Sequence, residues 1–290
     1  MFERILVATD LSDTSDQIIE NLDALRTLGT REVILSYCLE TLAPEPLTED
    51  ALALIRPKLE RQAQLARDTG LEVSVEATAG LPQREVLRVA DDRDVSLIVV
   101  GSHGRSLASE TLFGRTVGAL LHSARRPVLI VRIRHVKREG KSVNEVIPLE
   151  PVRHVLYASD FSDNAEHAFG LVRELARAGC RRFTLVHVQD KTRIGKHLED
   201  RLAEFNRIDT ARLERLKAQL IEDSAEDVTL ELPYGSPTSE ILRLARERNV
   251  SLLVMGNQGR GFISEVFLGS VSHNVARLAP VPVLLIPAAR

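Results

Sequence analysis

Several residue types and patterns are scarce in this sequence. It has no tryptophan and 2 cysteines, and aromatic residues make up only 4% of its 290 residues. No apolar run reaches the length of a membrane span, and the N-terminus lacks the apolar segment of a signal peptide. The 38 basic residues do not outnumber the 41 acidic ones, so no basic excess indicates a nucleic-acid partner. We therefore expect a globular cytoplasmic protein that binds neither nucleic acid nor membranes.

The cysteines and two missing motifs weigh against further classes of site. Cys38 and Cys180 both adjoin strand patterns, so we expect reduced thiols in or near the core. A zinc site would need more Cys and His residues at close spacing. No G-x4-G-K-[ST] motif supplies a P-loop lysine, and no G-x-G-x-x-G follows the first strand pattern. These absences weigh against P-loop ATPases and dinucleotide oxidoreductases.

A glycine-rich stretch lies near the C-terminal end. The apolar run 252–255 stops at Gly256, and Gly259 follows three residues later. Gly269 and Ser270 then begin a helical pattern. Glycines let backbone N–H groups approach an anion, and a helix start adds unpaired donors. The spacing predicts a buried strand, an anion-binding loop and a helix, and the alternative is a loop whose glycines only make turns.

The first half of the chain carries the same frame. Gly101, Gly104 and Gly114 follow an apolar strand pattern at the same spacing. The one departure is Arg115, which stands where the second copy has Ser270. Two copies of one frame indicate an internal repeat, which favours the anion-binding interpretation.

Each half alternates five strand patterns with helical ones, and its central strands are apolar throughout. This order predicts an α/β protein of two tandem doubly wound domains, each an open parallel sheet with helices on both faces. We expect the first domain in residues 1–135, a charged linker in 136–151 and the second domain in 152–290.

Ligands of such sheets bind beyond the carboxyl ends of the strands, where the strand order reverses. The first strand pattern of each half ends at an aspartate, Asp10 or Asp160. If the first and fourth strands are neighbours, Asp160 and Gly256 share one crevice. Asp10 and Gly101 then share the corresponding crevice of the first half.

These residues resemble the universal stress protein family in its tandem two-domain form, over nearly the whole chain. The resemblance is carried by ILVATDLSD and VLYASDFSD, by GSHGR and GNQGR, and by the Gly-x-Pro turns at 80–82 and 235–237. It implies the sheet order 3-2-1-4-5. It also implies ATP binding in members with G-x2-G-x9-G-[ST], whereas other members lack that motif and bind no nucleotide.

By position, the resemblance implies that Asp160 and the backbone near Val188 face the adenine, with Gly256 near the ribose. A turn or helix-capping role is the alternative for Asp160, and Val188 is included on the resemblance alone. The other expected nucleotide contacts are Gly259, Gly269, Ser270 and Val271, the first three at the phosphates.

Charged and imidazole side chains near the loops are weaker candidates. Arg260 and Arg105 follow the second glycine of each copy, where a guanidinium either pairs with phosphate or is an exposed loop residue. His103 and His273 have no nucleophile or metal partner at a recognisable spacing, so we expect them on the surface or in loops.

We expect weaker or no nucleotide binding in the first domain, because Arg115 replaces the small hydroxyl residue of the motif. A long cation there either favours phosphate or fills its place. The candidate residues of this domain are Asp10, Gly101, Gly104 and Gly114.

We therefore predict a stress protein that holds ATP, ADP or AMP mainly in the second domain, with a regulatory or signalling role. Asp163 or Glu265 could hold Mg²⁺, although carboxylates near helix starts are usually caps. An interaction module for protein partners or another small molecule is one alternative, and a slow ATPase is another. The last strands are open edges, so we expect the two domains to pair and a homodimer to be plausible.

Overall fold

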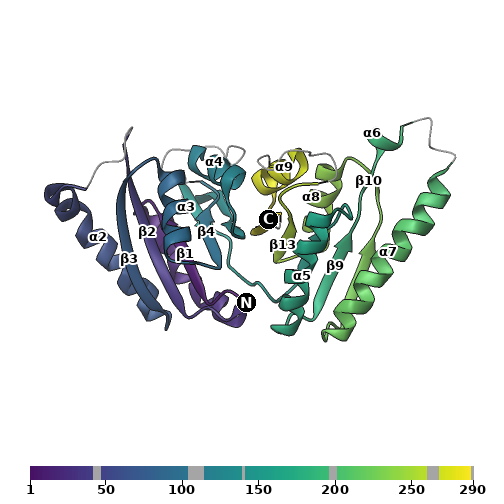
Figure 1. Cartoon of the computed structure of the whole chain (residues 1–290), viewed down its shortest axis with the longest axis horizontal. Coiled ribbons are helices and arrows are strands. Elements are labelled where there is room, and N and C mark those ends of the chain that lie inside the picture. The colour runs from purple at the N-terminus through teal and green to yellow at the C-terminus, as the bar shows by residue number, and fades with distance from the viewer. Residues whose placement is uncertain (42–46, 104–113, 139–140, 196–200, 260–267, 289–290) are drawn as a thin grey trace. The chain divides into compact units, whose positions relative to one another are not determined.

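The computed structural model describes residues 1–41, 47–103, 114–138, 141–195, 201–259 and 268–288. It forms two compact units, Met1–Leu149 and Glu150–Arg290. Each unit contains one parallel sheet with helices on both of its faces (Figure 1). The predicted fold class, two tandem doubly wound α/β domains, is confirmed.

The first unit follows the expected alternation of strands and helices. Its sheet order is β3-β2-β1-β4-β5, all parallel, which is the predicted order 3-2-1-4-5. Helix α1 contacts α2, and α3 contacts α4, so each pair covers one face. The elements are β1 (Arg4–Thr9), α1 (Asp13–Glu20), the 3-10 helix η1 (Leu22–Leu28), β2 (Glu32–Glu40), α2 (Glu49–Asp68), β3 (Glu72–Gly80), α3 (Pro82–Asp92), β4 (Leu97–Gly101), α4 (Arg115–Ser123) and β5 (Val128–Val131).

The second unit repeats this plan in the order β11-β9-β8-β13-β14. A short parallel bridge between β10 and β12 continues it beyond β9 and β11. The elements are β8 (Val155–Ala158), α5 (Asp163–Arg177), β9 (Arg182–Val186), β10 (Gln189–Asp190), α6 (Lys191–Ile194), α7 (Leu202–Glu222), β11 (Asp227–Glu231), β12 (Tyr234–Gly235), α8 (Pro237–Glu247), β13 (Leu252–Gly256), α9 (Ser270–Leu278) and β14 (Val283–Ile286).

The core of each domain is the continuous apolar surface of its central strands. Every residue of β8, β13 and β14 is buried, which explains why these strands read as unbroken apolar runs in the sequence. Helix α5 begins where the Ser162 hydroxyl accepts a hydrogen bond from the Ala165 N–H, and Ser12 caps α1 in the same way.

The segment expected as a charged linker, residues 136–151, contains regular secondary structure. Strands β6 (Ile133–Arg138) and β7 (Lys141–Val146) form an antiparallel hairpin within the first unit. The Gln17 side chain of α1 donates to the Asn144 carbonyl at 3.3 Å and accepts from the Val146 N–H at 3.0 Å. The amide therefore ties β7 to α1, a contact that charge composition alone does not predict.

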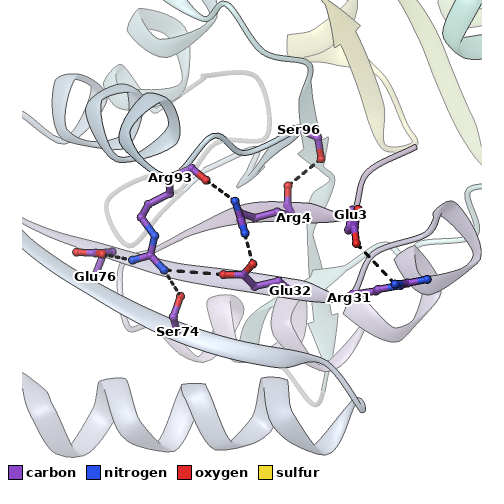
Figure 2. A network of polar contacts seen from close by, with 8 residues as sticks. All are labelled: Glu3, Arg4, Arg31, Glu32, Ser74, Glu76, Arg93 and Ser96. Atoms are coloured by element: carbon purple, nitrogen blue, oxygen red, sulfur yellow. Dashed lines mark hydrogen bonds and ion pairs between the residues drawn. The ribbon is translucent and has the colours of Figure 1, made fainter.

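A polar network joins the N-terminal ends of the strands in the first domain (Figure 2). Arg4 of β1 lies 2.5 Å from Glu32 of β2, and it donates to the Arg93 carbonyl at the end of α3. Arg93 in turn pairs with Glu76 and donates to Ser74 on β3. The network links three strands and one helix at the edge opposite the carboxyl ends of the strands.

In the second domain His154 occupies the position of Arg4. The Arg4 carbonyl accepts from the N–H of Ser96, just before β4, and the His154 carbonyl accepts from the N–H of Ser251, just before β13. The His154 side chain is buried, with Nε2 at 2.9 Å from the Thr184 hydroxyl. Burial, reinforced by the charge of Arg182, lowers the pKa of His154 to about 4.

This pKa predicts a specific loss of stability in acid. Between pH 6.5 and 4 the unfolded chain binds a proton at His154 that the folded domain excludes, so the free energy of unfolding falls as the pH falls. From pH 7 to 4.5 the wild type should lose about 2.5 kcal/mol more than His154→Gln, measured by urea unfolding. Equal losses in the two proteins would show that His154 is not held neutral.

Candidate functional site

A cavity of about 470 Å³ opens at the carboxyl ends of β8, β9 and β13 in the second domain. Helix α7 supplies one wall, and the N-terminal ends of α8 and α9 supply others. Because the order of the sheet reverses at β8, this is the crevice in which doubly wound domains bind ligands.

The structure brings together seven of the eight residues expected to contact a nucleotide in this domain. The eighth, Arg260, and the Mg²⁺ candidate Glu265 lie outside the described residues. The cavity is lined by Asp160, Val188, Gly256, Gly259, Gly269, Ser270 and Val271.

The carboxylate and the glycine loop meet as the strand order requires. Strand β8 pairs with β13, so Asp160 and Gly256 follow neighbouring strand ends. A Cβ added to Gly259 would lie 2.5 Å from Asp160 Oδ2, well inside contact distance. Any larger residue at this position would have to displace the Asp160 carboxylate.

Asp160 also forms a turn, which is the alternative role that the sequence suggested for it. Its Oδ1 accepts from the Ser162 N–H at 3.1 Å and from the Ser162 hydroxyl at 2.6 Å, and Phe161 adopts the left-handed conformation with φ of 56°. Asp10 and Leu11 repeat this turn in the first domain. One carboxylate oxygen thus makes the turn, whereas Oδ2 faces Gly259.

The loop after β13 is tied to the start of α9. The Gly269 N–H donates to the Asn257 carbonyl at 2.8 Å, and the Ser272 hydroxyl donates to the Gly256 carbonyl at 3.0 Å. Gly269 is the N-cap of α9 and provides no side-chain cap, and Ser270 is exposed. The positive end of α9 therefore opens onto the cavity, which is a favourable place for an anion.

Val188 presents main-chain groups to the cavity. The neighbouring N–H groups of His187 and Gln189 bond to the carbonyls of Glu231 and Pro233, on the β11 side. Along an extended chain, successive residues direct their N–H and C=O groups to alternate sides. The N–H and C=O of Val188, between β9 and β10, therefore face away from β11, toward the side where the chain leaves β8. Among the described residues no main-chain hydrogen bond of Val188 is formed. A donor and an acceptor therefore stand side by side at the cavity.

The wall formed by α7 brings in residues that the sequence did not single out. No residue of α7 before Leu213 is fully buried, and Phe205 and Ile208 line the cavity. Figure 1 shows α7 beside the strand end formed by β9 and β10. Asp209 connects the two elements, because its carboxylate accepts from the Gln189 side chain at 3.1 Å and lies 3.7 Å from His187 Nε2.

His187 is oriented by its other ring nitrogen. Its Nδ1 donates to the Ser159 carbonyl at 2.7 Å, and its ring lies 4.4 Å from the ring of Phe161. The guanidinium of Arg212 lies over the Phe161 ring, 5.2 Å from the ring centroid. Sequence spacing gave no signal for this cluster, because its members come from three separate elements.

The first domain has different surroundings at the corresponding glycine. A Cβ at Gly101 would meet the terminal methyl groups of Ile18 and Ile133, each at 3.0 Å. Gly114 is the N-cap of α4, which begins at Arg115. Gly104 and the side chain of Arg115 lie outside what the structure describes. The sequence did not predict the packing of Ile133, a residue of β6, against Gly101.

Both thiols follow the expectation of cysteines in or near the core, because Cys180 is buried and Cys38 is half-buried. Burial raises the pKa of Cys180 to about 11 and also raises that of Cys38. His103, expected on the surface or in a loop, lies in the loop after β4. It is nevertheless buried and stacks on His135 of the hairpin with ring centroids 5.5 Å apart.

Within the described parts of the chain, no three His, Cys, Asp or Glu side chains are grouped as a metal site would need. Among these residues, every helix is too short or too polar to span a bilayer.

Curated relatives match one half of the chain. A universal stress protein of Methanocaldococcus jannaschii is 26% identical over an alignment of 159 positions that covers 46% of this chain and 96% of that protein. A universal stress protein of Thermus aquaticus is 34% identical over 140 residues, again 46% of this chain and 96% of the relative.

Solved structures extend the likeness to the full length. A universal stress protein from Archaeoglobus fulgidus covers 100% of both chains with a TM-score of 0.74 at 23% identity, which shows a shared fold. The model of the universal stress protein family matches residues 1–132 and 151–287, one match for each domain. The repeated fold and these two matches lead to one conclusion: the chain belongs to the universal stress protein family.

Proposed function

We propose that the second domain binds an adenine nucleotide, ATP, ADP or AMP, in the cavity between β8, β9 and β13. The observation that carries the proposal is the placement of two complementary features in one cavity. The main-chain N–H and C=O of Val188 lie at one part of it, and the uncapped start of α9 lies at another.

The base is assigned to the Val188 side. The edge of adenine offers an amine donor beside a ring-nitrogen acceptor, which matches a backbone C=O beside a backbone N–H. Val188 is 9% exposed, and its side chain would contribute an apolar surface. Asp160 would also face the base, and Gly256 would lie near the ribose, as the resemblance implies.

The phosphates are assigned to Gly259, Gly269, Ser270 and the start of α9. Backbone N–H groups and a serine hydroxyl are suitable donors to phosphate oxygens, and the helix dipole favours the negative charge. A phosphate contact of Arg260 and a Mg²⁺ ion beside the phosphates stay predictions of this proposal.

We infer a cytoplasmic regulatory or signalling role, in which bound nucleotide changes the shape or the partners of the protein. Domain pairing and a homodimer remain predictions. A slow ATPase is the rival within the same site, and turnover that Ser270→Ala removes would support it. A protein that neither carries nor binds nucleotide would instead be an interaction module.

The first test identifies the nucleotide that purified protein carries. Denatured protein should release about one adenine nucleotide per chain, as measured by chromatography and mass spectrometry. Gly259→Val should weaken ATP binding about 10- to 100-fold, because its side chain would collide with Asp160 Oδ2.

A matched control separates this effect from a general effect of losing a glycine. Gly170→Ala lies in α5, where an added Cβ meets no atom within 4 Å, so this variant should keep full ATP affinity. Wild-type affinity in Gly259→Val would overturn the phosphate assignment.

The first domain is tested by Arg115→Ser, which restores the motif there. If Arg115 obstructs the site, this variant should bind about two nucleotides per chain by calorimetry, against one in the wild type. Unchanged stoichiometry would show that a feature other than Arg115 prevents binding, such as the packing of Ile18 and Ile133 against Gly101. Two nucleotides in the wild type would show that Arg115 is tolerated.

A further inference from the structure

We propose that Asn164 is a positioning residue for the phosphate site of the second domain, because it holds Asn257 and Gln258, the residues immediately before Gly259, in place. It acts through the loop and not by touching the ligand, since it is absent from the cavity lining. This inference rests on the proposed nucleotide binding and adds a residue on another element.

The contact joins the first turn of α5 to the loop after β13. Asn164 Nδ2 donates to Asn257 Oδ1 at 3.1 Å and to the Gln258 carbonyl at 3.2 Å. A main-chain carbonyl only accepts hydrogen bonds, so this partner fixes which end of the amide faces the loop. The two bonds hold the chain immediately before Gly259.

The held segment is connected to both parts of the proposed phosphate site. The Asn257 carbonyl accepts from the N–H of Gly269, the N-cap of α9. On the other side Gly259 follows Gln258 directly and lies against Asp160. Movement of the segment would therefore displace Gly259 and Gly269 together.

The buried side-chain amide of Asn164 is unfavourable for stability, because its hydrogen bonds are only partly satisfied. Asn164 is only 9% exposed, and its Oδ1 is buried without a hydrogen-bond partner among the described residues. An unsatisfied buried acceptor is unfavourable and calls for a reason. The two bonds donated by Nδ2 to the loop supply that reason.

Gly256 shows how closely the amide packs. A Cβ at Gly256 would lie 2.7 Å from Asn164 Nδ2, so the glycine that ends β13 makes room for this contact. The first glycine of the motif thus has a packing role against α5 in addition to its place in the cavity.

The first domain differs at this point. Ser12 and Ser162 are both N-caps, so Thr14 stands where α5 has Asn164. In that domain the residue after β4 is Ser102, whose hydroxyl accepts from the Ile133 N–H at 3.1 Å. The loop of the first domain is tied to the hairpin, whereas that of the second domain is tied to α5.

The test compares ATP with adenosine, because only ATP uses the phosphate loop. Asn164→Thr, which installs the residue of the first domain, should weaken ATP binding about 10-fold through the loss of two hydrogen bonds. Adenosine affinity should change less than about 2-fold. Calorimetric titration of the full-length protein measures both dissociation constants.

Asn206→Thr is the matched control. Asn206 is exposed on α7 and does not line the cavity, so both affinities should be unchanged. Asn164→Ser provides the same comparison without a β-branched side chain near the helix start, in case Asn164→Thr does not fold.

The outcomes separate this inference from the proposed function. A wild type that binds neither ATP nor adenosine would refute the nucleotide proposal itself. A wild type that binds both, with an unchanged ATP-to-adenosine affinity ratio in Asn164→Thr and Asn164→Ser, would overturn the positioning role. Equal weakening of both ligands would also overturn it, because the residue would then support the whole cavity.

Discussion

The parallel pairing of β8 with β13 is the constraint on which the second domain's site depends. The chain leaves β8 toward one side of the sheet and returns to β13 from the other, so the strand ends diverge above a crevice. Asp160 and Gly259 come into contact only because those two strands are neighbours. The same arrangement brings to one cavity the uncapped start of α9 and Val188, whose main chain makes no hydrogen bond within the described part of the chain.

Close packing around glycines gives the crevice its shape. Gly259 lies against a carboxylate oxygen, and Gly256 lies against the Asn164 amide. A side chain at either position would displace the Asp160 carboxylate or the Asn164 amide. The hydrogen bonds from Asn164, Ser272 and Gly269 then tie the loop to α5 and α9. Of the two side chains that donate, Ser272 lines the cavity and Asn164 does not.

The two domains share a fold and differ in what surrounds their crevices. In the first domain, the hairpin of β6 and β7 binds α1 through Gln17 and places Ile133 against Gly101. In the second domain, Asp209 connects α7 to Gln189 of β10. Duplication of the sheet therefore preserved the strand order, while local contacts beyond the strand ends diverged.

The sequence alone determined the repeat, the buried parallel strands and the glycine loop, because these depend on local composition and on spacing along the chain. It also identified Asp160 and five further residues that line the cavity, Gly256, Gly259, Gly269, Ser270 and Val271. Tertiary structure decided the hairpin, the burial of His103, the contact of Asp209 with Gln189 of β10 and the hydrogen bonds of Asn164. Each of these joins elements distant in sequence, and their pairing depends on side-chain packing that periodicity does not encode.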